Sequence, residues 1–244
     1  MPTYWEDLNW IEFQKKVPEE FITAIIPIGT IEGHGVGPLG TDNIIPIDIV
    51  RAIAEDCHAL ICPPIHYGQV RGLAGYPGSL VVDDDIFAEY CACVFRSIAS
   101  WGFDSLIVIN GHGGNTQSLK EAAWDAHNKT GMKILVVDWW SLAMPVCEDV
   151  YGHAGGHAGT DENAYIQAIR PETVHADLYS DDMVYVLAPG VAVYPYPGPV
   201  LVGPNSEGAP DFDPAKAQRY RDGAVAKVRE FCQTTLARWD AMGL

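Results

Sequence analysis

The chain has 244 residues, of which 48% are hydrophobic and 19% are charged. This composition is typical of a folded globular protein and excludes wholesale disorder, collagen and coiled coil. Fifteen lysines and arginines against 32 aspartates and glutamates give a formal charge of −17. Nucleic acids and anionic membranes are therefore not expected as partners.

The cysteines and the N-terminal segment predict a cytoplasmic protein. The six cysteines form no CxxC pair and no dense framework of disulfides, which is typical of free thiols in a reducing compartment. The first residues, MPTYWEDLNWIEF, mix acids with aromatics, whereas a secretory signal has a basic start and an apolar core. No apolar run reaches the roughly 18 residues of a membrane span.

Short apolar runs alternate with segments of helical spacing. The runs at 21–28, 60–65, 105–110 and 133–138 predict buried strands. Helices are predicted at 44–57, 84–101, 116–129, 161–170 and 213–239, with Asn115 as the N-cap of the third and Pro214 in the first turn of the last. This alternation predicts an α/β fold: a three-layer α/β/α sandwich with a mainly parallel central sheet, forming one domain over residues 1–244.

The segment 186–210 departs from this alternation. Its sequence, VLAPGVAVYPYPGPVLVGPNSEGAP, contains too many prolines and glycines for a continuous helix. We expect an excursion from the main fold, either a surface loop with irregular strands or a hairpin. Its apolar side chains would also suit a contact between subunits or a lid over a site.

Ionisable side chains follow the first predicted strand. Glu32 and His34 lie in the segment GTIEGHG, and Asp42 comes at the start of the first helix. In extended backbone, side chains two residues apart leave on the same face. Open α/β sheets bind ligands at this carboxyl edge, and glutamate, histidine and aspartate together form a ligand set for divalent metals.

Two later segments carry further candidates. His112 lies in the turn NGHGGN after the third strand, and His157 and Glu162 lie in the segment YGHAGGHAGTDE after the fourth. Without His157, these candidates give three carboxylates and two imidazoles, which suffice for two divalent ions if one carboxylate bridges them: Glu32, His34, Asp42, His112 and Glu162. This mixture suits Zn²⁺ or Mn²⁺ and admits Fe²⁺. Each histidine alone also fits a structural role, and the glycine-rich turn also fits a phosphate cradle.

Three motifs in chain order resemble the signatures of the creatininase family of amidohydrolases: IPIGTIEGHG…LGTDN, INGHGGN and HAGTDEN. The segment YPGSL at 76–80 is similar to the FPGT-type loop of that family, so the resemblance covers most of residues 20–170. It implies a homohexamer of α/β/α subunits and two divalent ions per chain. The implied metal ligands are Glu32, His34, Asp42, His112 and Glu162, with Asp42 as the bridge.

The resemblance also implies residues that act on the substrate. His157 matches the acid/base residue of the family, which passes a proton to the departing group, although a structural histidine would also fit this position. Four other residues are expected to contact the substrate: Ser79, Gly113, His153 and Arg71. Arg71 would donate to a substrate oxygen, unless it is a surface residue. Trp139 and Trp140 would line the pocket or belong to the core.

The chain departs from the family pattern at three places. Gly113 and Gly114 stand where creatininase proper has a tyrosine and a glutamate, so the outer ligand role falls to Glu162. His153 and Ala154 stand where it has the Trp-Asp pair that grips creatinine. Gly72 and Leu73 replace a Glu-His pair that many members carry. These departures argue against creatinine as the substrate.

The resemblance implies a metal-dependent hydrolase that opens a small polar cyclic substrate, a cyclic amide or a related ring carbonyl, by attack of a metal-bridged hydroxide. One alternative is a C–C bond hydrolase that opens a cyclic diketone, such as a dehydrogenated inosose. An alternative of another class is a non-catalytic module that binds a nucleotide or phosphate. The few cations favour a neutral substrate over a nucleotide.

Overall fold

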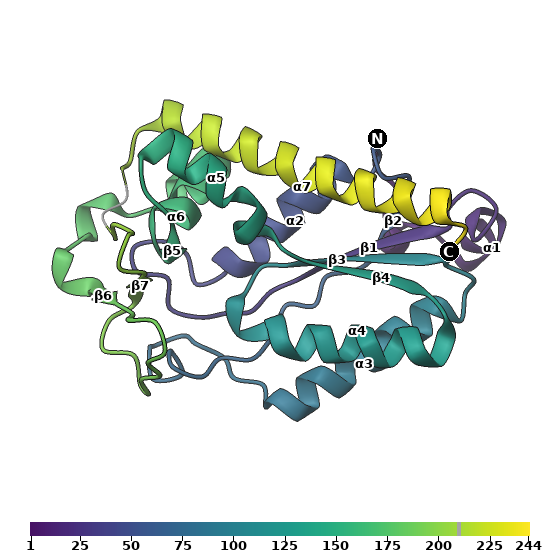
Figure 1. The fold of residues 1–244 in the computed structure, drawn as a ribbon, viewed down its shortest axis with the longest axis horizontal. Helices are drawn as coiled ribbons and strands as arrows, with labels where there is room; N and C mark the ends of the chain where they lie inside the picture. Colours follow the sequence, from purple (N-terminus) through teal and green to yellow (C-terminus); the bar gives the residue numbers. More distant parts are fainter. Residues whose placement is uncertain (209–210) are drawn as a thin grey trace.

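A four-stranded parallel sheet forms the centre of the protein (Figure 1). The computed structural model describes residues 1–208 and 211–244. The strands are β1 (Thr23–Ile28), β2 (Ala59–Ile61), β3 (Ser105–Asn110) and β4 (Lys133–Asp138), in the spatial order β2-β1-β3-β4. Every neighbouring pair is parallel, which confirms the predicted fold class.

Helices cover both faces of this sheet and complete the three layers (Figure 1). One face carries α2 (Thr41–Ile53), α5 (Trp139–Tyr151), α6 (Thr160–Ile169) and α7 (Pro214–Met242), and the other carries α3 (Asp84–Ala99) and α4 (Thr116–Thr130). Each face of the sheet has its own hydrophobic core, and alternate residues of a strand pack into one or the other. Ile25 packs with the first group of helices, and Ile26 packs with the second. β1, β2 and β3 are buried throughout, as expected for a parallel sheet covered on both faces, whereas the predicted burial of 133–138 is wrong: β4 lies at the edge of the sheet and is mostly half-buried.

Two helices were not predicted: α1 (Trp10–Lys16) and α5. In α5, Pro145 weakens the helical signal, since proline removes a backbone donor. The helix nevertheless buries Trp139, Ala143, Cys147 and Val150, whose spacing of four, four and three residues marks one helical face. The histidine-rich segment therefore follows α5 and not β4 directly.

Asn115 precedes α4 as predicted, but its proposed role as the capping side chain is wrong. No hydrogen bond joins its side chain to the first turn of the helix. Its amide nitrogen instead donates to the carbonyl of Gly29 at 3.1 Å, and its amide oxygen accepts from the backbone nitrogen of Gln69 at 3.0 Å. Asn115 thus joins the ends of β1 and β3 to the 66–70 segment, which serves the site described below.

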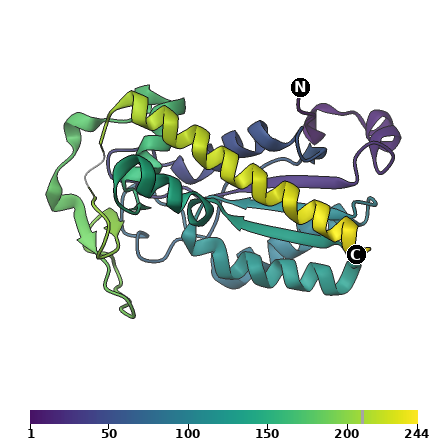
Figure 2. The ribbon, with the colours of Figure 1, turned by 45° about the horizontal axis from the view of Figure 1, so that its top comes forward.

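A second, three-stranded sheet lies beyond the carboxyl end of the main one (Figure 2). It contains β5 (Gly156–His157), β6 (Val184–Val186) and β7 (Val200–Val202), in the order β5-β7-β6. Because β6 and β7 are parallel, the hairpin expected within 186–210 is wrong: parallel neighbours need a crossover. The last two residues of that segment, 209 and 210, lie outside the described residues. Short 3₁₀ turns occupy Trp5–Asp7, Gly113–Asn115, Pro171–Thr173, Ala176–Leu178 and Asp181–Met183.

All six cysteines are free thiols, and Cys93 alone among them is exposed. Burial raises the pKa of the thiols of Cys62 and Cys91 to about 12, which suppresses the reactive thiolate. We expect Ellman's reagent at pH 8 to modify one thiol rapidly in the native protein and all six after unfolding in guanidinium. The variant Cys93→Ser should show no rapid phase, and two or more rapid thiols in the native chain would contradict this burial pattern.

Across the described residues, no helix combines the length and the hydropathy that a membrane span requires.

Candidate metal centre

The strand order places a crevice at the carboxyl ends of β1 and β3. The chain leaves β1 toward β2 on one side and leaves β3 toward β4 on the other, so the two strand ends mark the point where an open α/β sheet binds its ligands. Glu32 and His34 follow β1, and His112 follows β3. All three side chains are buried.

Two glycines allow the first turn of α2 to approach these strand ends. A Cβ at Gly29 would lie 2.2 Å from the backbone oxygen of Asp42, and a Cβ at Gly111 would lie 1.9 Å from the same atom. Only residues without a side chain permit such an approach. The approach holds the Asp42 carboxylate between the two strand ends, where it is 1% exposed.

Glu32, Asp42 and His112 form the first cluster. The Nδ1 atom of His112 lies 3.0 Å from Oε1 of Glu32 and 2.9 Å from Oδ2 of Asp42. Its Nε2 lies 2.7 Å from the carbonyl oxygen of Gln69, which can only accept, so Nε2 carries the proton. This contact fixes the ring and directs Nδ1 at the two carboxylates.

His34, Asp42 and Glu162 form the second cluster. The Nε2 atom of His34 lies 2.9 Å from Oδ1 of Asp42 and 3.6 Å from Oε2 of Glu162. Its Nδ1 donates to the backbone carbonyl of Glu32 at 3.0 Å. Glu162, in the first turn of α6, is fixed by the backbone nitrogen of Ala158, which donates to Oε2 at 2.6 Å. Asp42 therefore shares its two oxygens between the clusters.

The donor atoms of both clusters fit divalent ions. In each cluster one nitrogen and two carboxylate oxygens lie within 4.8 Å of one another. Oε1 of Glu32 and Oδ2 of Asp42 are buried and receive no hydrogen bond from the described residues. Buried anionic oxygens without a donor are costly, and a cation between them would remove that cost. Nitrogen and oxygen ligands of this kind suit Zn²⁺ or Mn²⁺.

The charges of the cluster attract positive charge. Burial alone would lower the pKa of His34, but the adjacent Asp42 carboxylate raises it to about 10. Likewise, Glu32 and Asp42 raise the pKa of His112 well above its ordinary value against the effect of burial. The pKa of Asp42 is in turn held far below its ordinary value by the two imidazoles, despite burial. Divalent ions would compete with these protons, so their uptake would release protons.

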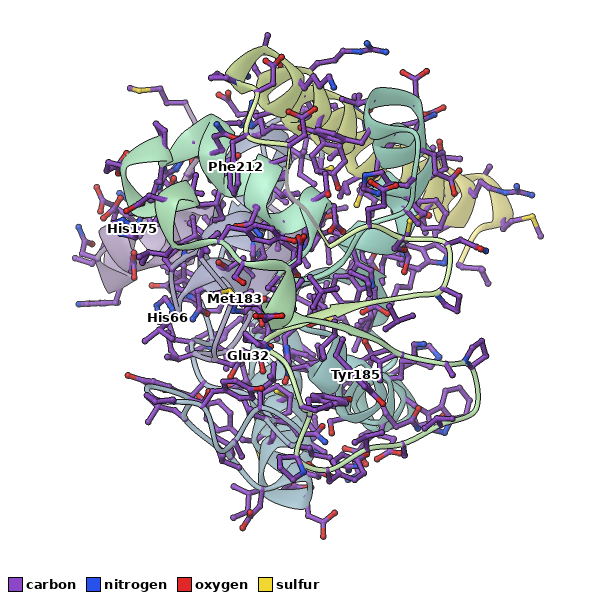
Figure 3. The ribbon with its side chains drawn as sticks, turned by 90° about the vertical axis from the view of Figure 1, so that its left-hand side faces the viewer. Glu32, His66, His175, Met183, Tyr185 and Phe212 are labelled. Atoms are coloured by element: carbon purple, nitrogen blue, oxygen red, sulfur yellow. The ribbon has the colours of Figure 1, made fainter. Side chains whose placement is uncertain are left out.

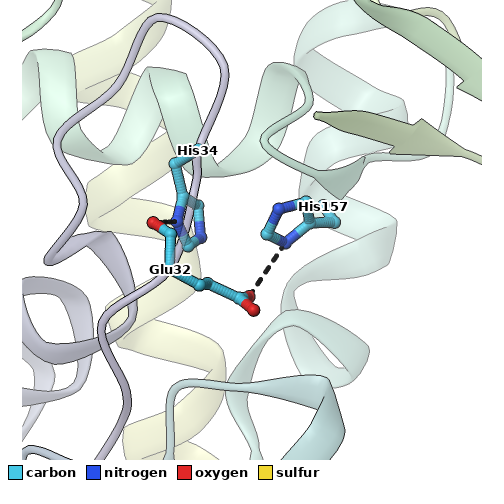
Figure 4. A group of neighbouring side chains, drawn as sticks. All are labelled: Glu32, His34 and His157. Atoms are coloured by element: carbon cyan, nitrogen blue, oxygen red, sulfur yellow. Dashed lines mark hydrogen bonds and ion pairs between the residues drawn. The ribbon is translucent and has the colours of Figure 1, made fainter. Parts of the chain in front are cut away.

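His157 lies beside both clusters (Figure 4). Its Nε2 lies 2.9 Å from the carbonyl oxygen of Gly33 and must donate to it, while Nδ1 lies 3.3 Å from Oε1 of Glu32. Its ring centroid is 4.4 Å from that of His34. Burial and the neighbouring His34 lower the pKa of His157 to about 4, so the ring is neutral at pH 7 with Nδ1 free to take a proton.

A cavity of about 790 Å³ opens onto the clusters through Glu32, His112 and Glu162. Of the residues predicted to contact substrate, Arg71 and Gly113 line it, whereas Ser79 and His153 are not among the described residues that do. The Ser79 hydroxyl instead accepts from the backbone nitrogen of Gly33 at 3.1 Å. Nδ1 of His153 lies 2.9 Å from the carbonyl oxygen of Ala154.

The two tryptophans after β4 divide between the two predicted roles. Trp139 is fully buried in the core, and Trp140 lines the cavity.

The lining of the cavity is strongly acidic. It includes six carboxylates, those of Glu32, Asp84, Asp85, Glu121, Asp161 and Glu162, but one cationic side chain, Arg71. Arg71 is exposed and already paired with Asp84.

Sequence reasoning missed several residues of this cavity. Asp161 is buried, accepts from the backbone nitrogen of Gly156 at 2.9 Å and lines the cavity beside Glu162. Its position next to Glu162 in the segment HAGTDEN is the sequence signal that could have identified it. Leu187, Tyr194 and Tyr196 reach the cavity from the predicted excursion, for which a lid over a site was one of the expected roles, but the sequence did not single out these three residues.

Known proteins resemble this chain over most of its length. The family model described as creatininase, creatinine amidohydrolase, matches residues 6–230. The mycofactocin precursor peptide peptidase of Mycobacterium ulcerans (strain Agy99) is 28% identical over 237 residues, covering 92% of this chain and 88% of the relative. The creatinine amidohydrolase of Pseudomonas putida is 25% identical over 194 residues, covering 72% and 75%.

A shorter match joins the chain to the 3-dehydro-scyllo-inosose hydrolase of Thermotoga maritima (strain ATCC 43589 / DSM 3109 / JCM 10099 / NBRC 100826 / MSB8), 33% identical over 91 residues, which cover 36% of this chain and 29% of the relative. Among solved structures, a mutant creatininase of the Zn-Zn type superposes with a TM-score of 0.84 at 20% identity, covering 96% of this chain and 98% of that one. A creatininase with Mn gives 0.81 at 21% identity, covering 96% and 99%. These structures share the fold.

Proposed function

Since the chain belongs to the creatininase family, as the match over residues 6–230 shows, we propose that it is a hydrolase with two divalent ions that cleaves an amide-type bond in a small, polar, uncharged substrate. A cyclic amide or a related ring carbonyl is the substrate class proposed first. The observation that carries the proposal is the position of Asp42, whose two carboxylate oxygens face His34 and His112 at 2.9 Å each.

The proposed ligands divide into two sets around this shared carboxylate. Glu32 and His112 would hold one ion, and His34 and Glu162 would hold the other, with Asp42 bridging them. Zn²⁺ or Mn²⁺ is proposed because the ligands are nitrogen and oxygen and because solved structures with this fold include a Zn-Zn creatininase and a creatininase with Mn. When bound, such ions polarise a carbonyl and lower the pKa of water to about 7.

His157 is proposed to move the proton. Its Nε2 donates to the carbonyl of Gly33, so Nδ1 is the basic atom, and it faces the cavity side of Glu32. A neutral imidazole in this position can take a proton as the nucleophile forms and pass it to the leaving nitrogen. The Gly33 carbonyl would keep the ring from turning, as an acceptor on the far nitrogen does for other catalytic histidines.

The charge of the cavity supports an uncharged substrate. Beyond the proposed ligands, Asp84, Asp85, Glu121 and Asp161 remain, against a single Arg71 that is paired with Asp84. An anionic phosphate would meet repulsion and find no free cation. The cavity thus weighs against a nucleotide- or phosphate-binding module, although the glycine-rich turn before α4 has the composition of one.

The same two-ion chemistry could also cleave two other kinds of bond. A cavity of about 790 Å³ exceeds the needs of one small ring, and a peptide peptidase matches 92% of this chain, so a short peptide is the second candidate substrate. Cleavage of a C–C bond in a ring diketone is the third, supported by the local match to 3-dehydro-scyllo-inosose hydrolase. In each case the two metal ions and His157 would have the same roles.

Removal and restoration of metal test the proposal. Protein dialysed against a chelator should bind about two equivalents of Zn²⁺ or Mn²⁺ per chain, measured by plasma mass spectrometry. Ring opening or cleavage should then return with metal on at least one member of a panel of creatinine, hydantoin, an N-acetylated dipeptide amide and a keto-inositol. A single tightly bound equivalent, or turnover that persists without metal, would refute a two-ion hydrolase.

We extend the proposal to assembly and location: a cytoplasmic homohexamer. The resemblance to the creatininase family supports the hexamer, and the six free cysteines support a reducing compartment. Light scattering coupled to size exclusion would give the mass of the assembly directly. A mass near that of one 26.6 kDa chain would contradict it.

A further inference from the structure

The loop that joins β6 to β7, residues 187–199, projects from the main layers (Figure 2). It contains no charged residue, in a chain whose formal charge is −17. Three of its side chains, Leu187, Tyr194 and Tyr196, line the cavity together with Glu32, His112 and His157. The loop therefore adds apolar and aromatic side chains to a cavity whose lining also carries six carboxylates.

Tyr196 is the residue through which this loop is attached to the body of the protein. Its backbone nitrogen donates to the carbonyl of Gly72 at 2.9 Å. Its own carbonyl accepts from the hydroxyl of Tyr76 at 3.0 Å. Both partners belong to the segment 69–79, of which Gln69, Arg71, Gly72 and Leu73 line the same cavity. These two hydrogen bonds fix the backbone of Tyr196, and with it the direction of the side chain.

The ring of Tyr196 fills the space beside Gly72. A Cβ at Gly72 would lie 2.3 Å from the Cδ2 and Cε2 atoms of the ring and 2.8 Å from Cζ. Gly72 is buried, and its lack of a side chain is what allows the ring to lie against the backbone. Gly75, in the same segment, differs: a Cβ there would meet nothing within 4 Å.

The polar end of Tyr196 is available to a ligand. The hydrogen bonds that join Tyr196 to other described residues use its backbone and not its hydroxyl, while burial, Tyr194 and the Glu32 carboxylate together raise the pKa of Tyr196. The hydroxyl therefore stays protonated and lies close enough to Glu32 to sense its charge. Tyr194 packs alongside, with ring centroids 6.2 Å apart and planes inclined by 35°.

We propose that Tyr196 is a substrate-contacting, specificity-determining residue: its ring, seated on Gly72, selects substrates that are flat beside the bond to be cut. The inference rests on the proposed two-ion hydrolase and names the shape that its substrate must have. Stacking on an aromatic ring is most favourable when the second group is also flat. A planar amide or unsaturated ring offers such a group, whereas a puckered polyol ring does not.

A pair of metal-binding probes tests this shape selection without turnover. Benzohydroxamate and cyclohexanecarbohydroxamate carry the same chelating group, but the first has a flat ring and the second a puckered ring of the same size. Isothermal titration of the metal-loaded protein should show that it binds benzohydroxamate about five-fold more tightly, which lies within the usual range for one aromatic contact.

Three variants assign that preference to Tyr196. Tyr196→Ala should reduce it to less than about two-fold, and Gly72→Ala should do the same by displacing the ring from its seat. Gly75→Ala, a matched change in the same segment, should keep the preference. Each variant should retain the metal content of the parent chain, because none of these residues belongs to the proposed ligand set.

The outcomes separate the two proposals. Equal affinity for both probes in the parent chain, or a preference that survives in Tyr196→Ala, would overturn the role of Tyr196 and leave the metal centre standing. Failure of the metal-loaded protein to bind either probe would overturn both proposals. A preference lost in Tyr196→Ala and Gly72→Ala but kept in Gly75→Ala is the result we expect.

Discussion

Replacing Asp42 by asparagine should empty both halves of the metal centre at once. The change removes one negative charge and puts an amide NH₂ group where one of the two carboxylate oxygens faces an imidazole at 2.9 Å. A bridging ligand serves two ions, so its loss weakens both. We expect metal content to fall from about two equivalents per chain to less than one, with turnover falling to background.

The fold itself should survive this substitution, because asparagine has the shape of aspartate and the backbone of Asp42 is unchanged. Circular dichroism and a thermal melt of the metal-free proteins would check this. Asp177→Asn, the same change on an exposed carboxylate, is the matched control and should keep both ions. Retention of two equivalents by Asp42→Asn would show that Asp42 is not a bridge.

Replacing His157 by glutamine should separate metal binding from proton transfer. Glutamine can still donate an amide N–H toward the carbonyl of Gly33, where Nε2 of His157 donates at 2.9 Å, but it has no atom that takes and returns a proton. Loss of a general acid/base typically reduces the rate by roughly 10²- to 10⁴-fold. We therefore expect a fall of that size in kcat, measured on the best substrate of the panel, with both ions retained.

A different result would follow if His157 were itself a ligand. Glu32, His34 and His157 also bring three donor atoms within 4.8 Å of one another, so loss of an ion from His157→Gln would reassign this residue to the metal. His175→Gln provides the control, since His175 is exposed and distant from Glu32 (Figure 3). An unchanged kcat in His157→Gln would remove it from the mechanism.

The main sheet could be predicted from the sequence because each of its strands is a short apolar run between breakers. Two of the four strands, 105–110 and 133–138, were predicted with the bounds that the structure gives. The predicted strand at 60–65 shortens to Ala59–Ile61, since Pro63 and Pro64 interrupt its ladder before an isolated bridge at Ile65. Apolar runs between breakers carry enough information for this kind of strand.

The convergence of the ionisable side chains also followed from the sequence. Residues after parallel strands meet at one edge of a sheet, so Glu32, His34 and His112 could be placed together before any coordinates. The hydrogen bonds that orient these side chains could not be predicted. The acceptors that fix the imidazoles are the backbone carbonyls of Glu32 and Gln69, and every residue in a chain has such a carbonyl.

The walls of the cavity were the least predictable part of the site. Ser79 and His153 were expected to contact substrate but are not among the described residues that line the cavity, whereas Tyr194 and Tyr196 do line it. Their approach depends on a crossover between two parallel strands of three residues each. Strands that short leave no periodic pattern in the sequence.

The small sheet connects His157, the proposed acid/base residue, to the loop that carries Tyr196. His157 in β5 is paired directly with Leu201 in β7, the strand into which the loop of Tyr196 runs. Four of the five proposed ligands instead come from the segment after β1, from α2 and from the turn after β3. A graft that exchanges the 187–199 loop for one of another length would consequently leave most of the ion-holding framework in place. The same graft would alter the strand that pairs with His157, the proposed acid/base residue.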